Sequence, residues 1–543
     1  MAPTLRASIG PMLVLVFSVG FAIWFLPSAY IDPRSTDWIF KESGPFIDGS
    51  GHAIQAMFFA AEPWDMPLGR FHSFGGPVGA SLIMAAVSPL FAFPVKMLEA
   101  VGAIGPFWQF VGLQGILGIC TTALSVYWLS RELRASRLAS VTVAVLSVPL
   151  PNLFVLAAFN ETLSWQCLVV FPMILLLRDR DARQPGYIWA LLFALAVWTN
   201  TYYVAMALPF YFVHLGIARI RHRQRLASSA MELALVVAVI GVLHFLGGGF
   251  TAPIGIAPPK DIDIYSVDLA DFFHRLYDRQ GYTYRGGTVL ILLAVGAVLA
   301  TIRARKEKAL PQGIGIVLLT YFVAFSLFVF STGPILHLGS TSFNPHWPTL
   351  VLNLMGLFRG VGRFSWPMIY FLLGVSAVSL DLLFREIAGR WPQKALAHVI
   401  CCFAVLFQFY EFLPEVCRFR DYNAQQIAGA FVPDQVLDGA IRNASEIVFV
   451  PAYDDPATAP WRPLSYYAIK YRVPIYTYHW LGRLNTSEAA RIQRLTVDNV
   501  TNCKLSPDKV YVLKTSYMPA LAQCRYSTDD LGTFANWRVV TIH

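Results

Sequence analysis

The stretch 217-IARIRHRQRLASSAMELALVVAVIGVLHFLGGG-249 places a short basic segment, residues 219–225, before an apolar run, residues 230–249. Basic segments of this kind recur between apolar runs and together hold 17 of the 42 Lys and Arg residues but only 5 acidic residues. Because short loops rich in Lys and Arg stay on the cytoplasmic side, this pattern predicts a polytopic membrane protein with these loops inside. The other four segments are residues 131–137, 178–183, 303–308 and 385–394.

The composition agrees with a membrane protein. Of the 543 residues, 56% are hydrophobic and 14% are charged, and the charged share is roughly half of the usual ~25% of globular proteins. The mean hydropathy is +0.52. These values exclude a soluble multidomain enzyme, a disordered chain and a disulfide-stapled miniprotein. The net charge of +9 follows from membrane topology, so we expect membrane lipids and no nucleic acid as partners.

About eleven crossings are expected, with the N-terminus inside. The first apolar run, residues 8–27, is interpreted as an uncleaved span, although a signal peptide is the alternative. Residues 30–106 then lie outside, and residues 79–98 within them are expected to form a re-entrant or interfacial helix pair broken at Pro89 and Pro94. The other crossings are expected at residues 107–130, 138–156, 163–177, 230–249, 287–302, 313–330, 365–384 and 395–412, with two more within 187–218.

The C-terminal part, residues 415–543, is expected to be an extracytoplasmic α/β domain next to a transmembrane domain of residues 1–414. Strand-like runs alternate with helix-like runs, which predicts a small, largely parallel sheet. Its aromatic side chains either form its core, which we favour for most of them, or stack on sugar rings. The strand-like runs are residues 446–450, 473–478, 510–513 and 539–542, the helix-like runs are 463–471 and 487–495, and the aromatics are Trp461, Tyr466, Tyr467, Tyr476, Tyr478 and Trp480.

Acidic residues of the outer segments are the candidates for catalysis. Asp48 and His52 are four residues apart and share a face if they are helical. Together they have the chemistry to remove a proton from an acceptor hydroxyl, whereas a helix-capping role for Asp48 is the alternative. Glu161 lies in a very short outer turn, where it is either a second catalytic or metal-binding carboxylate or a favourable charge at a helix start.

Two further segments carry candidate ligand-binding residues. The stretch 358-FRGVGRFSWP-367 places Arg359, Arg363 and Trp366 where a span enters from outside. Arginine is a strong phosphate ligand, so we favour binding of a lipid-linked phosphate over interfacial snorkelling. Tyr282, Tyr284 and Arg285 lie in an outer loop, where they line a sugar or lipid site or form part of an aromatic belt.

These features resemble, in their order, the C-type (GT-C) superfamily of integral membrane glycosyltransferases, and are most similar to a bacterial branch of it. The resemblance covers roughly residues 8–412. It rests on Asp48 and His52, on residues 58–59, on Trp64 with residues 67–69, on Gly-Tyr-x-Tyr at 281–284, and on Arg-x-x-Gly-Arg-Phe-x-Trp-Pro at 359–367.

The resemblance implies a fold, an activity and roles for residues. It implies transfer of a sugar, a hexose or a pentose, from a polyprenyl-phosphate donor to a glycan, lipid or protein acceptor outside the bacterial inner membrane. Asp48 is then the base in an inverting displacement, and Arg359 or Arg363 holds the donor phosphate. Related sequences carry a further Asp before a Pro-Leu pair, where this chain has Ser88. A second carboxylate is then Asp65 or Glu161, or is absent, so the requirement for a divalent metal (Mg²⁺ or Mn²⁺) stays undecided at this point.

The main rival class is a polytopic transporter or lipid flippase. Transporters often contain internal repeats and ionisable residues at midspan, and neither is prominent here, since polar residues collect in the outer segments. A structural protein of the envelope is a third class. Cys503 and Cys524, both in the expected outer domain, either form a disulfide or remain free.

Overall fold

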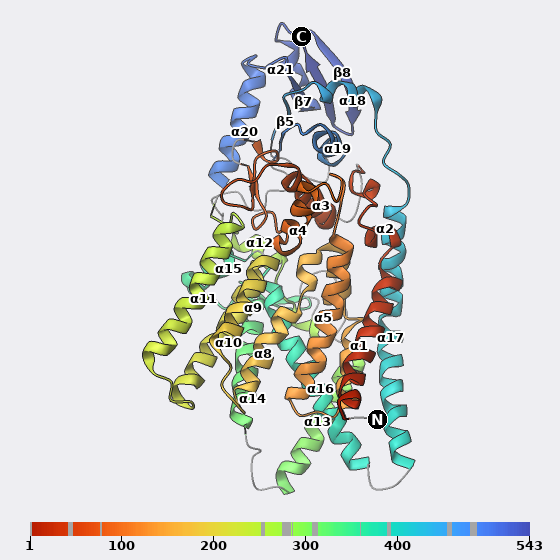
Figure 1. The fold of residues 1–543 in the computed structure, drawn as a ribbon, viewed down its shortest axis with the longest axis vertical. Coiled ribbons are helices and arrows are strands. Elements are labelled where there is room, and N and C mark those ends of the chain that lie inside the picture. The colour runs from red at the N-terminus through yellow and green to blue at the C-terminus, as the bar shows by residue number, and fades with distance from the viewer. Residues whose placement is uncertain are drawn as a thin grey trace. The chain divides into compact units, whose positions relative to one another are not determined.

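The structure is a computed structural model, and its chain forms two compact units (Figure 1). The helical unit comprises Met1–Leu26, Gln114–Gly241 and Ala257–Asp421, and the sheet unit comprises Pro27–Leu113, Val242–Ile256 and Tyr422–His543. The structure describes residues 3–41, 47–76, 79–250, 256–273, 284, 286–306, 313–358, 360–387, 392–452, 459–477 and 486–543.

The helical unit consists of long apolar helices that coincide with the expected crossings. In the described residues, eight segments are long and apolar enough to cross a membrane, and α6 with α7, bent by 48°, forms one more candidate. The apolar stretches of α9 (Gly186–Thr199) and of α13 (Gly287–Arg303) are shorter than 18 residues, so the number of crossings stays a prediction. The helices are α1 (Pro3–Phe25), α5 (Val111–Glu132), α6 (Arg137–Ser147), α7 (Pro151–Phe159), α8 (Cys167–Arg178), α9 (Gly186–Thr199), α10 (Thr201–Ile220), α11 (Leu226–Leu246), α13 (Gly287–Lys306), α14 (Ile314–Ser331), α16 (Trp366–Ile387) and α17 (Pro392–Ile427).

Small residues allow these helices to approach one another closely. A side chain added at Gly296 of α13 would overlap Ser379 of α16, and one added at Gly118 of α5 would overlap Ser164. Small residues at such crossings are typical of helix packing in membranes, where close van der Waals contact replaces hydrophobic burial.

The last helix extends beyond its expected end. The apolar run of residues 395–412 predicts a single crossing, whereas α17 has 36 residues and ends at Ile427. At 1.5 Å per residue this is roughly 54 Å, longer than the ~30 Å apolar core of a bilayer. The amphipathic continuation after residue 412 lacks the apolar character by which the crossing was recognised.

The sheet unit contains a five-stranded mixed sheet of order β6-β5-β7-β9-β8. The strands β6, β5 and β7 are parallel, whereas β9 is antiparallel to both β7 and β8. The expectation of a largely parallel sheet is therefore correct for β6, β5 and β7 but wrong for β8 and β9. The strand β8 escaped prediction because its sequence, TDDLGTF, is mostly exposed and lacks apolar alternation. The strands are β5 (Glu446–Val450), β6 (Ile475–Tyr476), β7 (Lys509–Lys514), β8 (Thr528–Phe534) and β9 (Trp537–Ile542).

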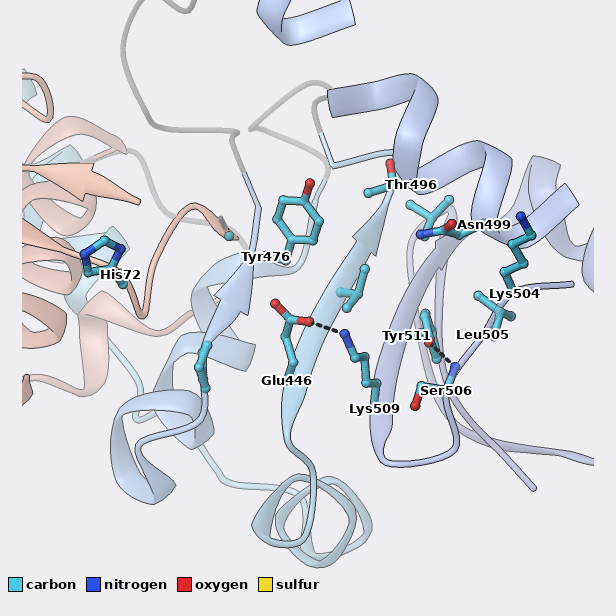
Figure 2. A pocket seen from close by; sticks show the side chains of 14 residues that line it. His72, Glu446, Tyr476, Thr496, Asn499, Lys504, Leu505, Ser506, Lys509 and Tyr511 are labelled. Atoms are coloured by element: carbon cyan, nitrogen blue, oxygen red, sulfur yellow. Dashed lines mark hydrogen bonds and ion pairs between the residues drawn. The ribbon is translucent and has the colours of Figure 1, made fainter. Parts of the chain in front are cut away.

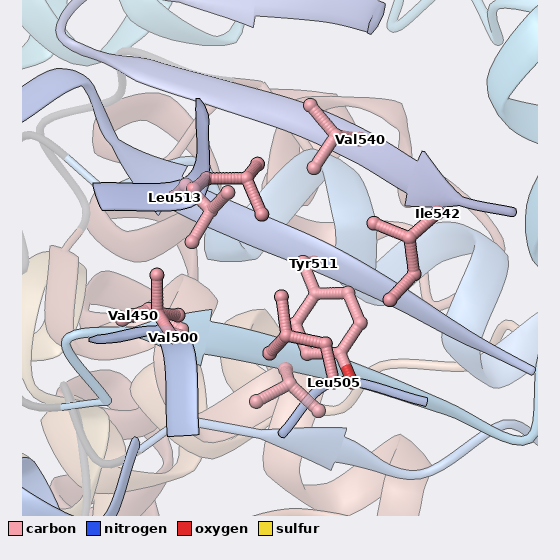
Figure 3. Close-up of a cluster of buried hydrophobic side chains, with 9 residues drawn as sticks. Val450, Val500, Leu505, Tyr511, Leu513, Val540 and Ile542 are labelled. Carbon is pink, nitrogen blue, oxygen red and sulfur yellow. The ribbon is translucent and has the colours of Figure 1, made fainter. Parts of the chain in front are cut away.

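Helices of the sheet unit cover this sheet and close a core of aliphatic side chains and Tyr511 (Figure 3). The core side chains come from β5, β7, β9, α20 and α21. The helices are α18 (Gln435–Arg442), α19 (Trp461–Tyr471), α20 (Thr486–Thr501) and α21 (Met518–Ala522). Cys503, after α20, is disulfide-bonded to Cys524, after α21, so the bonded alternative is confirmed.

Residues 27–113 belong to the sheet unit and contain α3 (Ile47–Ala61), β1 (Arg70–Phe71), β2 (Ala80–Ser81) and α4 (Pro89–Ala100). The expected helix pair at residues 79–98 is wrong, because β2 and turns precede a single helix. Pro89 begins α4, where its missing N–H needs no partner, and the helix continues through Pro94. A parallel bridge joins Phe74 to Ile475, the first residue of β6.

Candidate functional site

Arg363 is part of a compact cluster in the helical unit, at the short 3-10 turn η5 (Val361–Ser365) that precedes α16. Its guanidinium carbon lies 4.7 Å from the ring centroid of Tyr202, in the first turn of α10. The Tyr202 hydroxyl accepts the Gly360 N–H at 2.9 Å. A Cβ at residue 360 would lie 2.9 Å from the Arg363 guanidinium, so glycine allows this approach. Phe358 and Phe364 flank Tyr202 at centroid distances of 5.5 and 6.3 Å.

A buried polar turn, η3 (Glu161–Ser164), is bonded to the same end of α10. The Asn200 amide, which caps α10, donates to the Thr162 hydroxyl at 3.1 Å, and the Tyr203 hydroxyl donates to the Thr162 carbonyl at 3.2 Å. Glu161 is fully buried in this turn. The structure thus connects Glu161 to the Arg363 cluster through the first turn of α10.

Further buried polar groups lie on α7, α8 and α16 of this unit. The Asn152 amide donates to the Gln166 side-chain oxygen at 2.8 Å, and the Tyr370 hydroxyl donates to the same oxygen at 2.5 Å. Trp366, one helical turn before Tyr370, is fully buried. Its burial places it inside the helix packing of the unit.

Asp48 and His52 lie on α3 of the sheet unit, so they are one helical turn apart as expected. Asp48, in the first turn, is half-buried, and His52 is buried. Arg462 of α19 is also buried, and burial lowers its pKa to about 10, an effect that the carboxylate of Asp48 opposes. The candidate base therefore interacts electrostatically with a buried guanidinium from the C-terminal part of the chain.

Asp65 and Trp64 have local partners instead. Asp65 is exposed; it accepts the Met66 N–H at 2.7 Å and lies 3.3 Å from a ring nitrogen of His72, and both interactions lower its pKa. The Trp64 ring lies 4.6 Å from the ammonium of Lys96, which donates to the Phe59 carbonyl at 2.8 Å. This arrangement gives Trp64 a local packing role beside the buried Lys96.

Of the outer-loop candidates, Tyr284 is described. Its hydroxyl donates to Glu411 of α17, whose other oxygen accepts the Gly287 N–H at 2.8 Å. Tyr284 thus ties the start of α13 to α17 within the helical unit. Tyr282, Arg285 and Arg359 lie outside the described residues.

The described residues include no group of three or more His, Cys, Asp or Glu side chains that could hold a metal ion.

Sequence reasoning missed Asn200, Tyr202 and Arg462 as parts of these sites. Asn200 and Tyr202 lie in the polar run 198-WTNTYY-203, which was interpreted as an outer turn only. Arg462 is the one charged residue between Ala459 and Ile469. A single charge within the otherwise uncharged run 459–469 is a signal that could have identified it, because buried charges need a partner.

Comparison with protein families decides the classification. A family model described as "Domain of unknown function (DUF6311)" matches residues 15–412, and the model of the DUF6311 C-terminal domain matches residues 436–541. The chain belongs to the DUF6311 family. No curated protein matches this DUF6311 protein.

The DUF6311 protein is similar to solved structures of ArnT and of the archaeal oligosaccharyltransferase AglB. One is ArnT from Cupriavidus metallidurans bound to undecaprenyl phosphate, with 15% identity and a TM-score of 0.44 over 99% of this chain and 98% of that one. The apo state of ArnT has 14% sequence identity to this chain and a TM-score of 0.48, over 98% of each chain. The third structure is AglB from Archaeoglobus fulgidus in complex with an inhibitory peptide and a dolichol-phosphate. It has 12% sequence identity and a TM-score of 0.44, over 95% of this chain and 71% of that one.

Proposed function

We propose that this DUF6311 protein is a membrane glycosyltransferase that transfers a sugar from a polyprenyl-phosphate donor to an extracytoplasmic glycan, lipid or protein. The observation that carries the proposal is the Arg363 cluster. A guanidinium stacked on Tyr202 at 4.7 Å, beside a glycine-rich turn and among apolar helices, has the chemistry of a site for a phosphate on an apolar tail.

The proposed reaction is a direct displacement. The oxygen of an acceptor hydroxyl forms a bond to the anomeric carbon, and the bond from that carbon to the phosphate oxygen breaks. The electron pair leaves on the polyprenyl phosphate, whose growing negative charge Arg363 stabilises. Asp48 takes the proton of the acceptor hydroxyl, and the anomeric configuration inverts.

Asp48 is proposed as the base because of its position and its surroundings. It lies in the first turn of α3, where the helix dipole favours a negative charge, and it interacts with the buried Arg462. Arg462 is proposed as a positioning residue for Asp48.

The proposed compartment is the outer side of the bacterial inner membrane for residues 415–543. The Cys503–Cys524 disulfide supports an oxidising surrounding for this part of the chain. The basic segments between the spans support a cytoplasmic location for the opposite loops.

The test is release of sugar from a polyprenyl-phosphate donor by the purified protein, beside Asp48→Asn, Asp65→Asn and Glu161→Gln. We expect Asp48→Asn to lose at least about 100-fold in rate, the low end for a lost general base, with folding intact. Asp498→Asn, at an exposed position of α20, is the control. Equal rates for Asp48→Asn and wild type would remove Asp48 from the mechanism, and no donor consumption by wild type would overturn the proposed function.

A further inference from the structure

A cavity of about 540 Å³ lies within the sheet unit, on the face of the sheet next to α20 (Figure 2). Its walls are β5, β7, Tyr476 of β6, α20 and the loop from α20 to β7, with His72 and Gly76 from the N-terminal part of the unit. Its volume falls in the ~300–1,000 Å³ range of small-molecule sites. No role proposed above uses it.

The floor of the cavity is apolar and fixed. Val448 and Val450 of β5, Leu505, and Tyr511 of β7 line the cavity and also belong to the buried core of the sheet unit (Figure 3). Because these side chains are held by the packed core, the floor is formed before any ligand binds.

Polar groups surround this floor: one ion pair lies beside it, and a further cation, Lys504, is exposed at its edge. Glu446 and Lys509, at the starts of neighbouring parallel strands, form an ion pair of 2.6 Å (Figure 2). The Tyr511 hydroxyl accepts the Ser506 N–H at 2.7 Å, and burial raises the pKa of Tyr511, so this hydroxyl keeps its proton for donation. Asn499 of α20, exposed at the rim, offers both a donor and an acceptor.

Tyr476 provides an aromatic ring at one side of the cavity. The chain next to it is held to β6 by two backbone hydrogen bonds, from the Ile475 N–H to the Ser73 carbonyl at 2.8 Å and from the Gly75 N–H to the Ile475 carbonyl at 3.1 Å. A side chain at Gly76, whose φ is +56°, would overlap the Tyr476 ring. The ring is therefore held by backbone on one side, which leaves it little freedom to lose on binding.

From these features we infer that the cavity binds a short, uncharged saccharide, and that this is the sugar part of the acceptor. A saccharide presents C–H faces, which match the apolar floor and the Tyr476 ring, and hydroxyls, which need the mixed donors and acceptors of the rim. Glu446 and Lys509 neutralise each other, and Lys504 keeps its charge in solvent at the exposed edge, so the described lining favours a neutral polyhydroxyl ligand over a polyanion. The identification of the saccharide as the acceptor rests on the proposed function, whereas the binding itself does not.

The test is binding of three defined probes, chitotriose, maltotriose and mannotriose, to the full-length protein in detergent, by saturation-transfer NMR and calorimetry. At least one probe should bind at millimolar concentration or better. Tyr476→Ala should weaken it about tenfold, in line with the loss of an aromatic contact, and Asn499→Ala about fivefold, for one hydrogen bond.

Matched controls separate binding from folding. Tyr476→Phe keeps the ring and should bind within a factor of a few of wild type, while Tyr517→Ala and Asn502→Ala change the same residue types outside the cavity. Binding of none of the probes, or equal weakening by Tyr517→Ala, would overturn the inference. Saccharide binding without donor consumption would overturn the proposed function but support the saccharide site. Donor consumption without saccharide binding would support the proposed function but overturn the saccharide site.

Discussion

Arg363 is held by interactions that lysine cannot reproduce. Its planar guanidinium stacks on Tyr202, and a lysine ammonium would keep the charge but lose the stacking and the two-pronged hydrogen bonding. We expect Arg363→Ala to lower kcat/KM for a polyprenyl-phosphate sugar by about 10²–10³-fold, as for the loss of one hydrogen-bond donor that stabilises the developing charge. The kcat/KM of Arg363→Lys should lie between those of wild type and Arg363→Ala. Initial rates over a range of donor concentrations measure this. Arg494→Ala, on exposed α20, serves as the matched control, and a similar loss there would point to a general defect.

Lys96 predicts a pH dependence of stability. Burial lowers its pKa from the usual 10.5 to about 8. Between these values the unfolded chain binds a proton that the folded chain has released, so the free energy of unfolding rises with pH across this window. Thermal unfolding of wild type and Lys96→Met, measured from pH 7.5 to 10.5, isolates the effect. The rise should be smaller in the variant, and parallel curves would contradict the lowered pKa.

At the scale of elements, a buried polar network ties together α8, α10 and α11 within the helical unit. The ring of His214 lies 2.5 Å from Asp179 and 3.0 Å from Glu232, and Glu232 also pairs with Arg183. Gly186 begins α9 directly against the Glu232 side chain, where a Cβ would overlap it.

We expect Glu232→Ala to lower the free energy of unfolding by about 3–5 kcal/mol, because it leaves buried charges without their partner. Glu386→Ala removes one member of a partly exposed pair with Arg303 at 3.1 Å and should cost about 0–1 kcal/mol. Unfolding in detergent compares the two variants. Equal losses would show that the network contributes no more than a surface ion pair.

Elements could be predicted from the sequence where hydrophobic pattern alone decides them. The apolar runs gave the helices of the helical unit, and β-branched runs gave β5 and β7, because burial dictates both patterns. The strand β8 and the continuation of α17 after residue 412 could not be predicted in this way. Their residues are mostly polar or exposed, and pairing with β9 or extension of an existing helix holds them.

At the scale of the whole molecule, the charge pattern predicts an orientation that labelling can test. Ala227 lies at the start of α11, next to the basic segment 219–225, and Ser340 lies in the turn between the paired strands β3 (Leu336–Leu338) and β4 (Thr341–Phe343). In intact cells, a membrane-impermeant maleimide should label Ser340→Cys and should label Ala227→Cys only after permeabilisation. Wild type gives the background of the native thiols. The reverse pattern would invert the proposed topology.

The candidate site was predictable only in part. Arg363 stands out because it is a charge at the start of an apolar span, and Asp48 because it follows the first span. Their partners Tyr202 and Arg462 are distant in sequence, so only the folded chain identifies them. The grouping of residues 27–113 with the C-terminal residues depends on such long-range contacts too, which no local pattern encodes.

The Cys503–Cys524 bond has a consequence for biosynthesis. Residues 422–543 contain only these two cysteines, so one pairing is available within this part of the chain. Residues 415–421 add one more cysteine, the partly exposed Cys417, so maturation needs a thiol oxidase, and an isomerase only to undo a pairing with Cys417. A host that can oxidise thiols but cannot reshuffle them should therefore produce the Cys417→Ala variant as well as a host that can do both.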